Sequence, residues 1–176
     1  MSTTAAPFPD RAAAVVIGGG IAGCSVALHL ARAGLRDVLL VEKAELTSGS
    51  THHAAGLVTQ FNPSATMMRF RRYSVELYES LGAFNAVGSV RVASSRDAWL
   101  ALRRDASRAE ANGFTAELLS PEEVVARTPE ASAEGVRGGL WVGSDGWVDP
   151  HIVTHAVADA ARAEGVEIRL RTRLTA

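Results

Sequence analysis

Three glycines near the start of the chain, Gly18, Gly20 and Gly23, have the spacing of a diphosphate-binding turn. In such a turn Gly18 permits the tight bend, and Gly20 lets the backbone approach a pyrophosphate. Gly23 lets the following helix lie close to the preceding strand. The amide groups at the helix start, including those of Ile21 and Ala22, favour an anion together with the helix dipole. This spacing therefore predicts a dinucleotide site.

An acidic residue, Glu42, follows Gly23 by nineteen residues and ends a second apolar run. A carboxylate at this place accepts hydrogen bonds from a ribose, and it repels a 2′-phosphate, which argues against NADP. Lys43 is assigned to the same site. The pattern alone does not choose between NAD and FAD, and a glycine-rich turn without a ligand is the alternative.

The segment after Glu42 favours FAD. It is rich in small and hydroxyl residues that would let the chain pass under a long cofactor, whereas an NAD unit of this kind would return to the sheet through a helix. Its candidate cofactor-binding residues are Gly49, Ser50, Thr51, His52 and His53. The histidine pair has no acid or cysteine at ligand spacing, so no metal site is predicted.

The run 15–57 resembles the D-amino-acid-oxidase-type flavoproteins, and most of all their sarcosine and dimethylglycine dehydrogenases and oxidases. That group has a Leu-Thr-x-Gly-Ser-Thr-x-His-Ala segment, which Leu46–Ala54 reproduces. The resemblance implies FAD as cofactor and a covalent bond from His53 to the flavin 8α-methyl group. The family often has tryptophan where this chain has His52. The alternatives are that the histidines only hydrogen-bond the flavin or belong to a plain polar loop.

The resemblance continues more weakly to the end of the chain and implies an activity. The expected reaction is oxidation of a small amine, an N-methylglycine such as dimethylglycine or sarcosine, by hydride transfer to flavin N5. Folate is implied only for a region beyond this chain, and no catalytic residue is identified within it. One alternative is a flavoprotein with non-covalent flavin, like glycine oxidase or glycerol-phosphate dehydrogenase. The other is a non-catalytic, truncated nucleotide-binding remnant.

Apolar periodicity predicts an α/β fold, a partial doubly wound (Rossmann-type) parallel sheet with inserted antiparallel substrate-side strands. The predicted strands are 13–17, 37–42, 89–93, 116–119, 139–142 and 166–170. The predicted helices are 21–33, 65–81, 96–112, one starting at 120, and 150–164. The last strand is expected beside the second, and 43–62 is expected to be a loop. The strand 13–17 is expected to be buried on both faces.

The expected organisation is a disordered lead-in at 1–12 and the N-terminal part of one incomplete FAD-binding domain at 13–176. Because the chain stops just after a strand, a truncated fragment with an unpaired edge on the first strand is expected. Asp145, Trp147, Asp149 and His151 are expected at a junction between the substrate and nucleotide sides, with 144–146 as a turn.

Net charge and cysteine content bear on the binding partners and the cellular setting of the protein. The net charge of −1 gives no sign of a nucleic-acid or membrane partner, and the single cysteine, Cys24, indicates a buried residue in a reducing, cytoplasmic setting. The oligomeric state is not predicted. Two helix features are expected to be structural: an apolar core stripe formed by Met67, Phe70 and Tyr78, and a solvated face formed by Arg69, Arg71 and Arg72.

Overall fold

The computed structural model describes residues 9–130 and 132–175, which form two compact units. The first unit comprises the described parts of Met1–Ala55 and Asp149–Ala176, and the second is Gly56–Val148. The chain therefore passes between the units twice. Its second passage lies within the segment 145–151, which the sequence placed at a junction.

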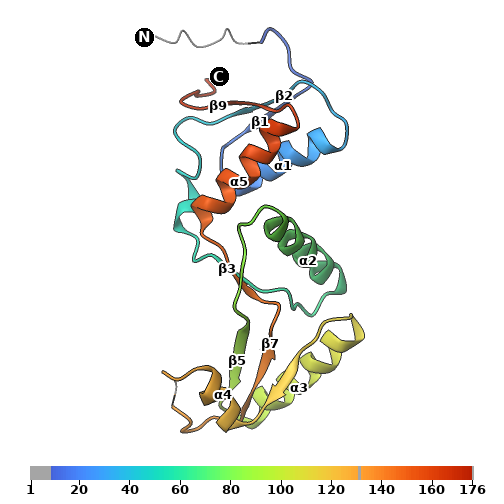
Figure 1. The fold of residues 1–176 in the computed structure, drawn as a ribbon, viewed down its shortest axis with the longest axis vertical. Coiled ribbons are helices and arrows are strands. Elements are labelled where there is room, and N and C mark those ends of the chain that lie inside the picture. Colours follow the sequence, from blue (N-terminus) through green and yellow to red (C-terminus); the bar gives the residue numbers. More distant parts are fainter. Residues whose placement is uncertain (1–8, 131, 176) are drawn as a thin grey trace. The chain divides into compact units, whose positions relative to one another are not determined.

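The first unit is built on a parallel sheet in the order β1-β2-β9. Its strands are β1 (Ala14–Ile17), β2 (Val38–Val41) and β9 (Glu167–Arg169). The third strand thus lies beside the second, as predicted. Helices α1 (Ile21–Arg32) and α5 (Pro150–Ala163) pack against each other and lie on one side of this sheet (Figure 1).

Local sequence explains why these helices form and where they stop. The buried residues of α1 recur every three or four positions, at Cys24, Ala27, Leu28 and Ala31. The helix ends before Gly34, whose φ of +92° suits the left-handed turn that follows. The Asp149 carboxylate caps the first turn of α5 by accepting the backbone N–H groups of Ile152 and His151. These hydrogen bonds hold the pKa of Asp149 below its usual value.

The expectation that the first strand is buried on both faces is wrong. Val15 and Ile17 are 52% and 63% exposed, because α1 and α5 cover only the opposite face. Among the described residues no strand pairs with the outer edge of β1, which agrees with the predicted unpaired edge. By contrast, all four residues of the central strand β2 are buried.

The second unit holds two small antiparallel sheets. One has the order β5-β7-β6, formed by β5 (Ser89–Ala93), β7 (Gly138–Val142) and β6 (Glu117–Leu119). The other has the order β3-β8-β4, formed by β3 (Leu57–Val58), β8 (Gly146–Trp147) and β4 (Asn85–Ala86). Its helices are α2 (Ala65–Ser80), α3 (Arg96–Ala111) and α4 (Pro121–Arg127). The predicted inserted antiparallel strands are confirmed.

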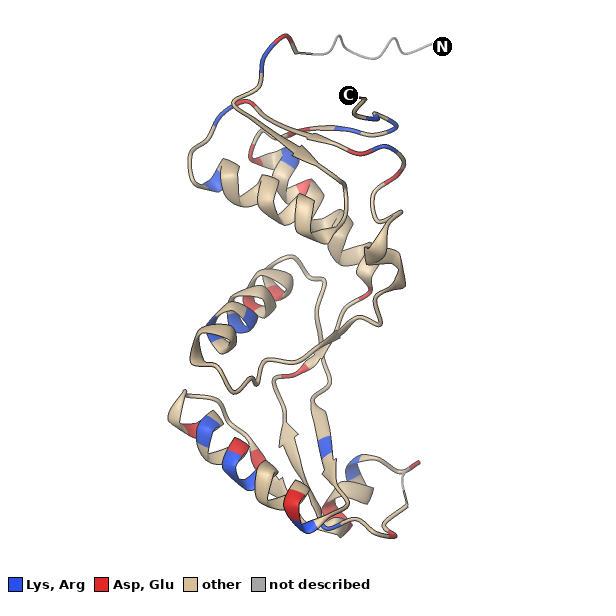
Figure 2. Ribbon diagram, turned by 180° about the vertical axis from the view of Figure 1, so that it is seen from behind, with Lys and Arg blue, Asp and Glu red and all other residues tan. Residues whose placement is uncertain are grey.

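Helix α3 of the second unit carries more charged residues than helices α1 and α5 of the first unit. Lys, Arg, Asp and Glu recur along α3, whereas α1 and α5 carry few charges (Figure 2). The buried residues of α3 are Leu102, Asp105 and Ala109, and Ala98, Trp99 and Ala106 are partly buried beside them, so its charged residues lie mostly on the opposite face. The difference fits two helices packed on each other and a third that is amphipathic.

The predicted core stripe of α2 is partly wrong. Met67 and Phe70 are 44% and 63% exposed, and Met68 is buried instead. Met68 packs in a cluster with Phe61, Ala109 and Phe114. The helix therefore turns a neighbouring apolar face inward. Tyr78 is half-buried, and burial raises the pKa of its hydroxyl.

Two predicted irregular stretches contain regular structure. Residues 43–62 include the short 3₁₀ helix η1 (Ser50–His53) and strand β3. The turn expected at 144–146 falls at 143–144, and Gly146 belongs to β8. In 9–130 and 132–175, no helix has the length and apolar character needed to cross a membrane.

Candidate functional site

The glycine turn between β1 and α1 has the backbone geometry that its predicted role requires. Gly18 has a φ of +112°, and its N–H donates to the Val41 carbonyl at 2.8 Å. A Cβ atom at Gly23 would lie 1.9 Å from the carbonyl oxygen of Gly18. Only glycine at position 23 therefore lets α1 start this close to the turn.

Because Gly20 has no side chain, the Thr51 side chain can lie against it. A Cβ atom there would lie 2.8 Å from the hydroxyl of Thr51 in η1. That hydroxyl accepts a hydrogen bond from the N–H of Ile21 at 3.2 Å. The predicted flavin segment thus lies directly against the start of α1.

The N-terminus of α1 is open to an anion. Its N-cap, Gly20, has no side chain, and the first turn contains no acidic residue. Within the described residues, the N–H groups of Ala22 and Gly23 have no hydrogen-bond acceptor. Unpaired amides and the positive end of a helix dipole are the elements of a phosphate site.

The Glu42 side chain is hydrogen-bonded to the glycine turn. The carboxylate is 9% exposed, and its Oε2 accepts the N–H of Gly19 at 2.7 Å. Its Oε1 accepts the N–H of Ala44 at 2.8 Å. A carboxylate has lone pairs for further donors, so these bonds are compatible with the predicted ribose contact. Lys43, also assigned to the site, is exposed.

Gly19 and Thr47 belong to this arrangement although the spacing did not single them out. A Cβ atom at Gly19 would lie 2.8 Å from Leu46 and 2.9 Å from Glu42. The carbonyl of Gly19 accepts the N–H of Thr47 at 3.0 Å. The run of three consecutive glycines was the available signal for Gly19, and for Thr47 it was the Leu-Thr pair that opens the Leu46–Ala54 segment.

The two candidate histidines lie at the end of η1, which packs against α5. Both are exposed, and their ring centroids are 5.4 Å apart with planes at 74°. The N–H of His52 donates to the Gly49 carbonyl at 3.2 Å, which helps to close the short helix. In the part of the chain that the structure describes, no cluster of His, Cys, Asp and Glu could hold a metal ion.

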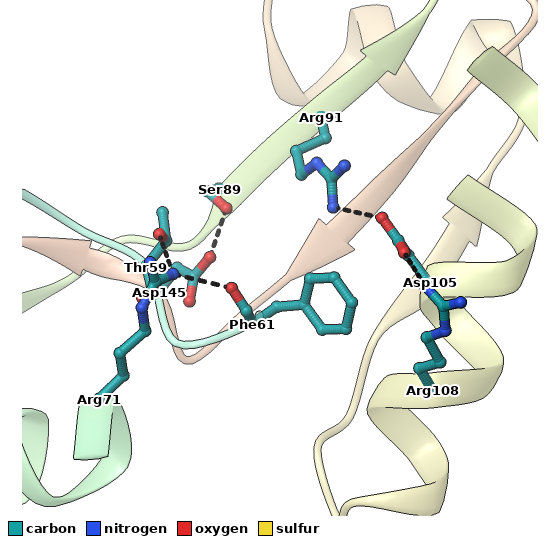
Figure 3. Close-up of polar contacts among 8 residues, drawn as sticks. All are labelled: Thr59, Phe61, Arg71, Ser89, Arg91, Asp105, Arg108 and Asp145. Atoms are coloured by element: carbon teal, nitrogen blue, oxygen red, sulfur yellow. Dashed lines mark hydrogen bonds and ion pairs between the residues drawn. The ribbon is translucent and has the colours of Figure 1, made fainter. Parts of the chain in front are cut away.

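The second unit contains a separate network of polar contacts (Figure 3). Asp145 is 2% exposed and accepts hydrogen bonds from the Gln60 N–H at 2.7 Å and the Ser89 hydroxyl at 2.6 Å. Arg91 pairs with Asp105 at 2.8 Å. Each of these charges is satisfied within the unit, so the network holds its loops and strands together.

The expectation that three arginines of α2 form a solvated face is wrong for two of them. Arg71 donates to the carbonyls of Thr59 and Phe61, and Arg72 donates to the carbonyl of Gly113. These bonds fasten α2 to neighbouring loops, because the loops present carbonyls within reach of the long side chains. Arg69 is exposed, as expected.

Comparison with known proteins agrees with this geometry. The family model described as FAD dependent oxidoreductase matches residues 13–176. Rat mitochondrial dimethylglycine dehydrogenase is 37% identical over 175 residues, which cover 96% of this chain and 20% of the rat protein. Human mitochondrial sarcosine dehydrogenase is 35% identical over 170 residues, which cover 92% of this chain and 18% of the human protein. The chain thus spans about a fifth of these relatives.

Among solved structures, L-proline dehydrogenase from P. horikoshii matches this fold with a TM-score of 0.88. The match has 28% sequence identity and covers 96% of this chain and 46% of that protein.

Proposed function

The chain belongs to the family of FAD-dependent oxidoreductases, and from this premise we propose that it forms the FAD-binding portion of an amine oxidoreductase. The observation that carries the proposal is the open N-terminus of α1, where unpaired amides of Ala22 and Gly23 adjoin a turn that only glycine can form. Bound FAD would supply an acceptor for the hydride removed from the amine.

Each part of the site has a proposed part of FAD to hold. The helix start formed by Gly18, Gly20, Ile21, Ala22 and Gly23 would hold the diphosphate. Glu42, with Lys43 beside it, serves the ribose end. The segment from Gly49 to His53 would lie toward the flavin, since Leu46–Ala54 reproduces the segment of the sarcosine and dimethylglycine group.

A covalent link through His53 is the finer part of the proposal. The link would join an imidazole nitrogen of His53 to the 8α carbon of the flavin, and that carbon and that nitrogen would each lose one hydrogen. The two protons and two electrons released would pass to dioxygen, which the proposal takes as the oxidant. The exposed position of His53 leaves its ring accessible for this bond.

The proposed substrate is an N-methylated glycine such as dimethylglycine or sarcosine. Its support is the identity to proteins whose names state these substrates. Because the chain covers about a fifth of their length, we expect that the 176 residues alone bind the cofactor without turning over the amine. Folate remains a proposal for a region outside this chain, and a cytoplasmic location stays a prediction; the two relatives are named as mitochondrial.

A second candidate is a dehydrogenase of a cyclic secondary amine such as L-proline, and for it we propose a flavin that is not covalently bound. The structural match to L-proline dehydrogenase supports this substrate, since L-proline, like sarcosine, is a secondary amine. In this case the histidines of η1 contact the flavin without bonding to it.

Anaerobic reduction of the bound flavin tests the proposed reaction. In the full-length protein that carries this chain, loaded with FAD, dimethylglycine or sarcosine should bleach the flavin absorbance, and glycerol 3-phosphate should not. Bleaching by L-proline alone would favour the second candidate. Bound flavin that none of these amines reduces would overturn the substrate class, and failure to bind FAD would overturn the site.

A further inference from the structure

Thr47 is buried in a conformation that threonine rarely adopts. It is 4% exposed and has a φ of +68°, in the left-handed region that disfavours β-branched residues. Such a conformation persists only where surrounding contacts fix it. One contact is the bond from its N–H to the Gly19 carbonyl at 3.0 Å. The contacts of Thr47 therefore determine how the chain leaves the glycine turn.

The second contact of Thr47 is His151, in the first turn of α5. The Thr47 hydroxyl lies 3.0 Å from Nδ1 of His151. Since a hydroxyl both donates and accepts, this bond forms with either ring tautomer. The backbone N–H of His151 is held by the Asp149 carboxylate at 2.8 Å, and its ring lies against His155 with centroids 4.3 Å apart. His151 thus projects from a capped helix.

The position of η1 depends on these contacts. Its N-cap, Gly49, comes two residues after Thr47, and η1 lies beside α5, where the teal segment meets the first turn of the orange-red helix in Figure 1. Within η1, the Thr51 hydroxyl is held by the Ile21 N–H at 3.2 Å. Two threonine hydroxyls therefore tie the segment, one to α5 and one to α1.

His53 has no such tie of its own. Its ring is exposed and has no hydrogen-bond partner in residues 9–130 and 132–175. Its direction consequently follows from the backbone of η1. A displacement of the η1 backbone therefore moves the His53 ring nitrogen that is proposed to bond the flavin.

We propose that His151 is a positioning residue for flavin attachment, acting through Thr47 to hold η1 so that His53 meets the flavin methyl group. The proposal rests on the covalent link proposed above. The rate of bond formation depends strongly on the distance and angle between the two reacting atoms, so a small displacement of η1 slows it strongly. Binding of FAD at the start of α1 uses other groups and is largely unaffected.

The test compares covalent attachment with total FAD binding in the full-length protein. Apoprotein is mixed with FAD in air, and protein-bound flavin fluorescence after denaturing electrophoresis gives the attachment rate. H151A and T47V each remove the hydrogen bond. H151N keeps a polar atom near the place of Nδ1, and H155A removes the neighbouring ring, which has no hydrogen bond to Thr47. Thermal unfolding and total bound FAD are measured for every variant.

We expect H151A and T47V to attach flavin about tenfold more slowly or worse, and H151A to keep total FAD binding close to wild type. H151N should recover most of the rate, H155A should match wild type, and the double variant H151A/T47V should be no slower than either single variant. Wild-type rates in H151A and T47V overturn the positioning role and leave the covalent link standing. Equal losses in H155A, or losses that only follow unfolding, also overturn it. A wild type that binds FAD without any covalent attachment overturns both proposals.

Discussion

The Glu42 carboxylate lies 2.7 Å from the amide nitrogen of Gly19, joining the end of β2 to the glycine turn that precedes α1. The other carboxylate oxygen accepts the Ala44 N–H. One buried side chain thus holds both the turn and the start of the segment that leads to η1. Each of its two oxygens accepts a backbone N–H of the protein itself.

Replacing Glu42 with Gln should weaken the site. A glutamine offers a single acceptor oxygen, so one of the two amides, Gly19 or Ala44, loses its partner. The expected loss is about 1–3 kcal/mol in the free energy of unfolding, with weaker FAD binding. Urea unfolding and FAD titration measure the two effects. E42Q with wild-type stability and affinity would show that this brace is dispensable.

Gly23 should tolerate no side chain. In G23A the methyl group would lie 1.9 Å from the Gly18 carbonyl oxygen, so the helix start must move. We expect a loss of about 3 kcal/mol or more in unfolding free energy and no measurable FAD binding. The contrast for stability is G49A, because an added methyl at Gly49 meets nothing within 4 Å. Similar melting temperatures for G23A and wild type would contradict the close packing.

These glycines show why part of the site was predictable. A turn that needs glycine is encoded within a few residues, so the spacing of Gly18 and Gly23 was sufficient. The brace between Glu42 and Gly19 spans 23 residues, and the sequence indicated the acid without its inward contact. The bond between Thr47 and His151 spans 104 residues and depends on how α5 packs on α1, so no local pattern could reveal it.

Burial was harder to predict than secondary structure. An apolar run such as that of β1 indicates a strand but not whether both of its faces are covered, and Val15 and Ile17 are exposed. On α2 the apolar residues form overlapping faces one position apart. Tertiary packing on Phe61 selects Met68 over Met67, which the helical period alone does not determine.

Asp145 gives a test of the second unit. In D145A the Gln60 N–H and the Ser89 hydroxyl lose their shared acceptor in a buried place. We expect a loss of about 1–3 kcal/mol in unfolding free energy. D145N is the matched control: its oxygen can accept the Gln60 N–H, and the Ser89 hydroxyl can turn to accept from the new amide. Equal destabilisation by the two variants would contradict this assignment of hydrogen bonds.

Cys24 should make stability fall in alkaline solution. Burial, partly offset by the charge of Arg162, raises the pKa of its thiol from 9.0 to about 11. The folded state therefore disfavours the thiolate, and its stability is fully present below pH 9 and declines as the pH rises toward 11. Urea midpoints at several pH values should show a decline that is smaller in C24A. Parallel curves for C24A and wild type would contradict a buried neutral thiol.

The adjacent histidines should differ in their effect on the cofactor. Because the register of Gly49, Ser50 and Thr51 favours His53 for the proposed flavin bond, H53A should bind FAD without any covalent flavin. H52A should keep the covalent flavin, since His52 occupies the place of a residue that does not bond it in the family. Gel fluorescence after denaturation distinguishes the two variants, and the reverse pattern would move the attachment to His52.

Mass spectrometry of the denatured wild-type holoprotein tests the account most directly. The full-length protein is loaded with FAD, unfolded, separated from its supernatant and digested. We predict that the peptide containing His53 carries the mass of the flavin with fragment ions that place it on that residue, and that the supernatant holds no flavin. Free FAD in the supernatant together with an unmodified His53 peptide would contradict the covalent site.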